Sequence, residues 1–320
     1  MSTTLTTHLR SGRVHTLVAL IARRHAVTRR DLQVALGLFW LLDGALQAQP
    51  FMFTHGFATQ VLAPVGEGQP GFVSAPVHWA STVIAANPVA WNVPFAGIQL
   101  LLGIGLLVPR TARLTLAASI AWALGVWYLG EGLSGLASGH ASLITGAPGS
   151  ALIYALLAGA AWPRRDASRE APAPWLPLAW AVLWVGGAVF QALPGQNSGA
   201  AIASALTAGT SGAPAWLAGV DNSVGAWAAH HGLLLVTVMV VAEVLIGVGA
   251  LARRTRTPAV ALGFGLTLVL WVLGQDLGAL YTGRATDPNS GLVLAVMAIA
   301  LLAGFRALAP SPRATRPQRS

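Results

Sequence analysis

Four acidic side chains stand inside strongly apolar stretches of this chain: Asp43, Glu131, Glu243 and Asp276. An ionisable group in hydrocarbon costs at least about 2.5 to 3.5 kcal/mol on membrane-insertion scales. Each of these acids therefore needs either a partner or a function.

Two of the acids, Glu131 and Asp276, belong to a ten-residue segment that occurs twice with small changes. "WYLGEGLSGL" begins at Trp127, and "WVLGQDLGAL" begins at Trp271, 144 residues later. The same offset relates further pairs of identical residues: Trp40 and Trp184, Gln47 and Gln191, Gly103 and Gly247. The match continues into the last apolar stretch of each half after a four-residue deletion. The sequence therefore predicts a tandem duplication.

The duplication pairs carboxyls with amides, because Gln99 corresponds to Glu243 and Glu131 to Gln275. Two carboxylates at close range resist joint ionisation, whereas an amide donates its N–H to a single carboxylate. We expect each pair to meet across a pseudo-twofold axis. The alternative is that each side chain caps a helix end or bonds a Ser or Trp within its own half.

Counting about 1.5 Å per residue from the predicted cytoplasmic turns places the polar residues in two layers. The predicted midplane binding layer holds Asp43, Gln99 and Glu243. The predicted outer binding layer holds Glu131, Gln275, Asp276, Trp127 and Trp271.

Five histidines fall on or near the predicted outer face: His55, His78, His140, His230 and His231. Neutral imidazole binds many metals and ligates haem, so these residues are candidate ligands. The alternative is that they form hydrogen bonds at the surface, because their spacing matches no known metal motif.

Composition identifies a helical membrane protein. Hydrophobic residues make up 55% of the chain, charged residues 9%, and mean hydropathy is +0.64. Stretches of about 20 apolar residues fit helices that cross a bilayer. The net charge of +9 lies at the predicted membrane flanks, which favours anionic lipid and excludes nucleic acid as a partner. The absence of cysteine excludes disulfides and thiolate metal sites.

We predict an all-α fold with eight transmembrane helices in two tandem four-helix repeats. The expected spans are 32–49, 90–109, 114–136, 149–163, 174–193, 231–252, 257–280 and 290–308. Arginine concentrates in the short turns between spans, so the positive-inside rule predicts cytoplasmic termini and a multi-pass inner-membrane protein of a bacterium.

The predicted organisation has a basic cytoplasmic tail at 1–31, which is either an interfacial helix or a flexible segment, and a basic C-terminal tail at 309–320. The repeats occupy 32–163 and 174–308, joined by a cytoplasmic linker at 164–173. The two long outer loops are rich in Trp, Ala and Val. We expect interfacial or re-entrant helices there, with Trp79, Trp91, Trp216 and Trp227 at the membrane interface.

The stretches "GIQLLLGIGLLVPRTAR" and "AEVLIGVGALARRTR" resemble the second-helix signature of the DoxX/DoxD-like membrane proteins. In that signature an acid or amide precedes a Gly-rich apolar run that ends in Arg. The resemblance implies two fused four-helix units. It also implies an association with respiratory or sulfur redox systems, with a quinone or haem site and a redox partner protein.

Three functions remain open at this stage. The first is a redox-associated subunit with a quinone or haem site near the outer face. The second is a small-solute or proton-coupled transporter that uses the midplane acids. The third is a non-catalytic assembly protein in which the acids only hold helices together.

Overall fold

The computed structural model describes residues 27–163 and 173–307, with side chains up to residue 303. Within these ranges every regular element is a helix, and no strand occurs. The predicted all-α class is confirmed. Residues 1–26 of the predicted N-terminal tail, the C-terminal tail and most of the linker at 164–173 fall outside the described residues, as does the predicted interfacial helix near the N-terminus.

The first unit comprises residues 29–160. Its long helices are α2 (Arg29–Gln47), α3 (Gly71–Ala86), α4 (Pro88–Leu107), α5 (Ala112–Leu129) and α6 (Ser150–Ala160). Short helical turns connect them: η1 (Pro50–Phe53), η2 (Phe57–Leu62), η3 (Ala63–Gly66) and η4 (Gly132–Gly135).

The second unit comprises residues 176–307. Its elements are α7 (Leu176–Ala192), α8 (Gly199–Thr207), α9 (Ala215–His230), α10 (Gly232–Gly249), α11 (Arg256–Val272), η5 (Asp276–Thr282) and α12 (Asn289–Ala307).

The two units follow the same order of long helices. Both bounds of α3 and α9 differ by 144 residues, and the first residues of α4 and α10, and of α5 and α11, differ by the same number. Packing follows the same order, because α2 packs on α4 as α7 packs on α10, and α5 packs on α6 as α11 packs on α12.

Small residues bring the first pair of helices in each unit together. A Cβ on Gly103 would lie 2.9 Å from the carbonyl oxygen of Gly37, and a Cβ on Gly247 would lie 3.0 Å from that of Ala181. Real Cβ atoms do not approach backbone this closely without a shift. The Gly-rich run of α4 and α10 therefore serves close helix packing.

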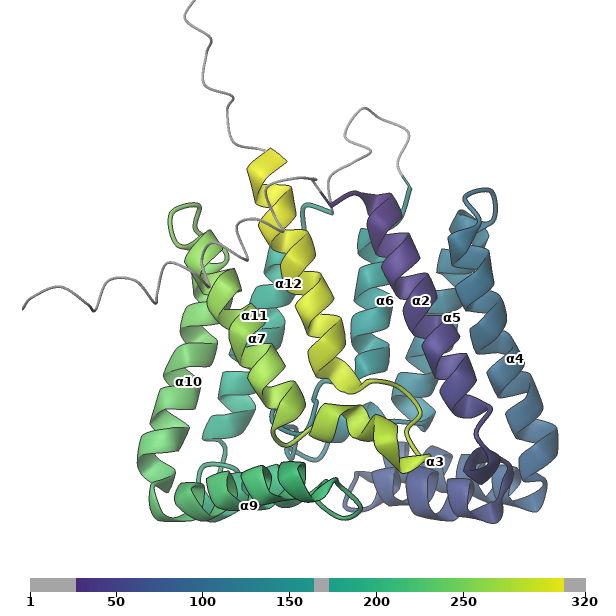
Figure 1. Cartoon of the computed structure of the whole chain (residues 1–320), viewed down its shortest axis with the longest axis horizontal. Coiled ribbons are helices and arrows are strands. Elements are labelled where there is room, and N and C mark those ends of the chain that lie inside the picture. The colour runs from purple at the N-terminus through teal and green to yellow at the C-terminus, as the bar shows by residue number, and fades with distance from the viewer. Residues whose placement is uncertain (1–26, 164–172, 308–320) are drawn as a thin grey trace, which may run out of the picture.

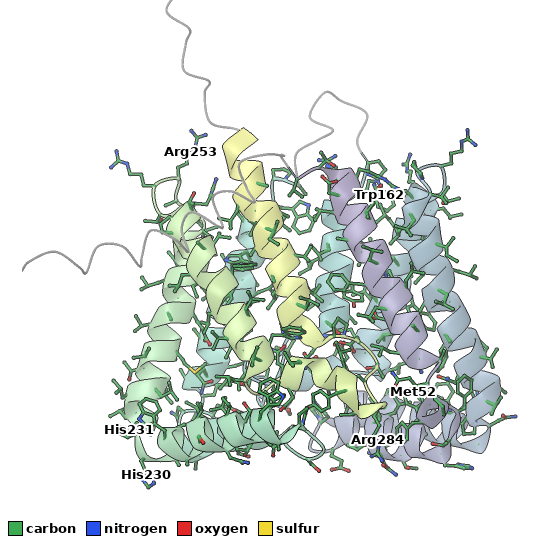
Figure 2. All side chains as sticks on the ribbon, in the orientation of Figure 1. Met52, Trp162, His230, His231, Arg253 and Arg284 are labelled. Atoms are coloured by element: carbon green, nitrogen blue, oxygen red, sulfur yellow. The ribbon has the colours of Figure 1, made fainter. Side chains whose placement is uncertain are left out.

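Figure 1 shows α3 and α9 lying along one end of the molecule, roughly across the direction of the other long helices. The first turn of α2 and the last turn of α12 lie at the opposite end. In Figure 2, Arg253 and Trp162 lie at that opposite end, whereas Met52, His230, His231 and Arg284 lie near α3 and α9. The two long outer loops are thus helical and share one end, as the sequence predicts.

Each of the eight predicted spans coincides with a helix, but their lengths differ. Among the described residues, four helices are long and apolar enough to cross a membrane: Pro88–Leu107, Ala112–Leu129, Gly232–Gly249 and Arg256–Thr282, the last counted together with η5. Helices α6, α7 and the described part of α12 are apolar but shorter. The predicted spans 114–136 and 257–280 run past the regular α-helices, which end at Leu129 and Val272.

Candidate functional site

The ten-residue segment that occurs at 127–136 and again at 271–280 contains a left-handed turn in both units. Its residues take positive φ values of 54°, 56°, 51° and 78° at 132–135, and of 49°, 55°, 69° and 52° at 276–279. Left-handed backbone costs roughly 1 to 2 kcal/mol for each residue with a side chain. Surrounding contacts must stabilise such a turn. The turn ends α5 and α11 earlier than hydropathy alone predicts.

The turn presents a side chain to the start of the last helix in each unit. Glu131 Oε1 accepts hydrogen bonds from Ala151 N at 3.0 Å and from Ser150 Oγ at 2.9 Å. Gln275 Oε1 accepts one from Gly291 N at 2.9 Å. Both side chains therefore satisfy free N–H groups in the first turn of α6 or α12.

The tryptophan that opens the ten-residue segment fixes the residues before the same helix. Trp127 Nε1 donates to the carbonyl oxygen of Pro148 at 2.7 Å, and Trp271 Nε1 donates to that of Pro288, also at 2.7 Å. The repeated residues thus hold two equivalent joints between a helix end and a helix start.

The expectation that carboxyl and amide meet across an axis is wrong. No hydrogen bond joins Glu131 to Gln275, or Gln99 to Glu243, in the described part of the chain. Glu131 bonds only inside the first unit. The Gln275 side-chain amide donates to the carbonyl oxygen of Leu143 at 3.0 Å. The alternative, in which these side chains cap helix starts in their own halves, is confirmed for Glu131 and Gln275.

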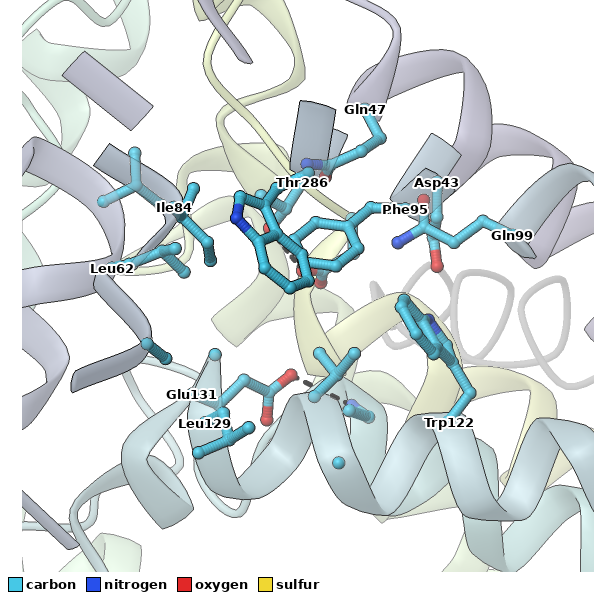
Figure 3. A pocket seen from close by; sticks show the side chains of 18 of the residues that line it. Asp43, Gln47, Leu62, Ile84, Phe95, Gln99, Trp122, Leu129, Glu131 and Thr286 are labelled. Carbon is cyan, nitrogen blue, oxygen red and sulfur yellow. Dashed lines mark hydrogen bonds between the residues drawn. The ribbon is translucent and has the colours of Figure 1, made fainter. Parts of the chain in front are cut away.

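A cavity of about 400 Å³ lies among the helices of the first unit. Figure 3 shows Asp43, Gln99 and Trp122 on one side of this space, and Leu129 and Glu131 on another. Aromatic side chains form much of its wall: Trp40, Phe57, Trp79, Trp91, Phe95, Trp122 and Tyr154. A flat, amphipathic molecule suits such a lining.

Polar groups at the wall are only partly satisfied. The hydroxyl of Tyr154 donates to Asp43 Oδ1 at 3.2 Å, and the Asp43 side chain is 2% exposed. Gln99 Oε1 and Trp122 Nε1 are buried and have no hydrogen-bond partner among the described residues. A buried acceptor and donor without partners are uncommon in native structures and suit a ligand that supplies both.

The second unit also reaches this cavity, through Thr286 and Asp287 in the segment before α12. The carboxylate of Asp287 accepts hydrogen bonds from Thr286 Oγ1 at 2.9 Å and from Asn289 N at 2.8 Å. The charged side chains among the described lining residues are thus all acidic: Asp43, Glu131 and Asp287.

The remaining predicted site residues lie elsewhere. Glu243, Gln275, Asp276, Trp127 and Trp271 are not among the residues that line the cavity, nor are His55, His78, His140, His230 and His231. The described residues contain no group of three or more His, Asp or Glu placed to hold a metal ion. The predicted midplane layer is divided, because Asp43 and Gln99 face the cavity and Glu243 belongs to α10 of the other unit.

Asp276 of the predicted outer layer has an acidic partner. It lies beside Asp221 of α9, and both carboxyls are buried. Burial, followed by the neighbouring carboxyl of Asp276, raises the pKa of Asp221 from 3.8 to about 7. Two carboxyls that share a site resist joint ionisation. The second unit therefore holds an acid pair next to η5.

Sequence reasoning missed four residues of the cavity and of the acid pair: Trp122, Tyr154, Asp221 and Asp287. Tyr154 is one of only three tyrosines and lies in an apolar stretch, so its hydroxyl needs a partner. Asp221 is the one acid in α9, a helix rich in Ala, Val and Trp, and this signal resembles the one that singled out the other four acids. Neither Trp122 nor Asp287 has a comparable sequence signal.

Comparison of the chain with models of known protein families, with curated proteins and with solved structures found no match.

Proposed function

We propose that this chain is a multi-pass membrane protein built from two tandem four-helix units in the same orientation. The shared offset of 144 residues, the equivalent Trp–Pro hydrogen bonds and the position of α3 and α9 at one end support this proposal. Eight helices would then cross the bilayer, with the Arg-bearing turns and both termini in the cytoplasm of a bacterium.

We further propose that the cavity of the first unit binds the ring of a quinone or quinol. The observation that carries this proposal is the combination of an aromatic wall with an unpartnered donor, Trp122 Nε1, and an unpartnered acceptor, Gln99 Oε1. A quinone offers carbonyl oxygens to a donor, and a quinol offers hydroxyls to an acceptor. Haem receives less support, because no described histidine lines the cavity.

The residues of the chain would have distinct roles. Trp122 and Gln99 orient the ring through its oxygens. The Asp43 carboxylate has one hydrogen-bond donor, Tyr154, and is the group best placed to hold a proton. Glu131 accepts from Ser134, Ser150 and Ala151, so its role is to hold the wall of the cavity.

A bound quinone supplies two-electron, two-proton chemistry in the membrane. The protein would position the ring, exclude water and exchange protons at Asp43. Electrons would pass to or from a separate redox partner protein, in line with the resemblance to DoxX/DoxD-like proteins.

Filling the cavity tests the proposal. A Cβ on Gly125 would meet no atom within 4 Å, and Gly125 lines the cavity. Gly125→Phe should therefore fold and abolish binding of a short-chain benzoquinone to purified protein. Gly265→Phe is the matched control, because Gly265 is equally open but does not line the cavity. Equal binding by both variants would contradict the proposal.

A proton-coupled transporter is the second candidate, because the Asp43 carboxyl lines a cavity that a solute could enter. Proteoliposomes distinguish the two. Asp43-dependent proton uptake driven by a solute gradient, without quinone binding, would favour the transporter.

A further inference from the structure

The second unit contains the same parts as the cavity, in a different arrangement. At the offset of 144 residues, Gly187 takes the place of Asp43, Glu243 takes that of Gln99, and Trp184 takes that of Trp40. Glu243 Oε2 lies 3.6 Å from the position of a Cβ built on Gly187. The carboxyl of the second unit thus extends from α10 toward the place where the first unit has an acid on α2.

Polar atoms on α10 and on the helices that pack against it, α7 and α11, are buried without partners. They include Glu243 Oε2, Trp184 Nε1 and Thr267 Oγ1, and none of these has a hydrogen-bond partner among the described residues. The equivalent tryptophan in the first unit is satisfied, because Trp40 Nε1 donates to Ser119 Oγ at 2.8 Å. Gly263 replaces Ser119 in the second unit. Buried polar groups without partners are costly and uncommon in native structures, so these groups suit a ligand that forms hydrogen bonds with them.

A side chain from the first unit fills the space beside them. Leu143 Cδ1 lies only 2.3 Å from a Cβ built on Gly187, so the leucine occupies the volume that an Asp43-like side chain would need. Leu143 is 5% exposed, and its carbonyl oxygen is held by Gln275 Nε2 at 3.0 Å. Its neighbour Ile144 packs against Gly274.

The first unit receives a different insertion. The segment before α12 brings the polar Thr286 and Asp287 to the edge of the first unit's cavity. The segment before α6, by contrast, brings the apolar Leu143 into the second unit. Each unit therefore receives a segment of the other unit in its interior. Only the segment inserted into the second unit places a bulky apolar side chain, Leu143, beside a carboxyl, that of Glu243.

We infer that the second unit holds a second binding site, centred on Glu243, that Leu143 closes. This inference rests on the proposed function for its ligand, a quinol ring whose hydroxyl donates to the Glu243 carboxylate. Withdrawal of segment 141–146 opens the site. That withdrawal requires release of the hydrogen bond between Gln275 Nε2 and the Leu143 carbonyl oxygen.

Binding stoichiometry tests the inference. A short-chain benzoquinol is titrated under anaerobic conditions into wild-type protein and into Leu143→Gly. We expect one bound molecule for the wild type and two for the variant, with the additional molecule lost when Glu243→Gln is added. Leu143→Ile keeps the side-chain volume and should bind one. Melting curves verify folding, and Leu143→Ala replaces Leu143→Gly if the latter unfolds.

The outcomes separate the inference from the proposed function. A folded Leu143→Gly or Leu143→Ala protein that binds no more quinol than the wild type overturns the second site. If the wild type binds none but the variant binds one molecule in a Glu243-dependent manner, the first cavity is not a quinol site and the second site stands.

Discussion

The two units share a frame and differ in what that frame encloses. Both have the left-handed turn, the Trp–Pro hydrogen bond and the glycine at the first helix contact. The first unit adds Asp43 and Tyr154 around an open cavity, whereas the second has Gly187 and Leu294 at the corresponding places and Leu143 inserted beside them. Residues that set the backbone recur, and residues that line the interior have diverged.

Position by position, the units also exchange their acids. At the offset of 144 residues, Asp43 corresponds to Gly187 and Gln99 to Glu243, so each unit has one carboxyl near the contact of its first and third long helices. Two carboxylates there would repel each other. Each unit therefore has one acid at this contact, but the acid is on the first long helix, α2, in the first unit and on the third long helix, α10, in the second.

The largest expected effect comes from giving the second unit the acid of the first. Gly187→Asp would place a carboxyl against Leu143 and beside Glu243. Overpacking and like charge together should cost about 4 kcal/mol or more. The reverse exchange, Asp43→Gly, removes one hydrogen bond and should cost about 1 to 2 kcal/mol. Thermal melts in lipid nanodiscs measure both, and equal losses would contradict the described difference between the interiors.

Next in size are the glycines of the left-handed turns. A Cβ on Gly132 would lie 2.4 Å from the Val65 carbonyl oxygen, and one on Gly278 would lie 2.5 Å from Pro288 C and O. Alanine at either place should cost about 2 to 3 kcal/mol in unfolding free energy.

Gly68 provides the control for this prediction. It has a φ of 67° and nothing within 4 Å of a built Cβ, so Gly68→Ala adds backbone strain without a clash and should cost about 1 kcal/mol. Similar melting temperatures for all three variants would show that the turns tolerate a Cβ.

The helix-capping joints should respond in the same way in both units. Glu131→Ala and Gln275→Ala each leave N–H groups of a helix start without a partner, at a cost of about 1 to 2 kcal/mol. Glu131→Gln keeps the acceptor oxygen that Gln275 uses in the second unit, so it should recover most of the loss. Melting of the three variants checks this, and a Glu131→Gln protein as unstable as Glu131→Ala would show that the charge of Glu131 matters.

The last expected effect is a pH dependence of stability that arises from the acid pair of the second unit, Asp221 and Asp276. The folded pKa of Asp221, about 7, exceeds its ordinary value of 3.8, so the native state binds more protons than the unfolded state between these values. Stability should therefore be greatest below the window, fall as pH rises through it and level off above about 7.

Asp221→Asn should flatten that fall, and it should be more stable than the wild type above the window. Glu67→Gln, at an exposed acid, is the control and should leave the pH profile unchanged. A fall of the same size in Asp221→Asn would assign the pH dependence to another group.

Sequence patterns predicted the frame better than the site. Apolar length and arginine positions located every long helix, and the offset of 144 residues identified equivalent places in the two units. The ends of α5 and α11 were missed because hydropathy does not report φ. The left-handed turn appears only in the backbone.

The side-chain partners could not be predicted because the direction of each side chain was unknown. Equal depth suggested that Glu131 and Gln275 meet, but both turn toward the start of the last helix in their own unit. Asp287 reaches the first cavity, and Leu143 the second unit, through segments whose paths depend on packing between the units. Periodicity carries no information on such long-range contacts.

The most direct measurement of the central claim is photolabelling with a light-activated benzoquinone, followed by mapping of the labelled peptides. The claim is that the open cavity belongs to the first unit and is completed by the segment before α12. Labels should therefore fall on lining segments within 40–154 and at 286–287, and Gly125→Phe should remove them while Gly265→Phe should not. Labels confined to 232–272 in the wild-type protein would contradict the claim.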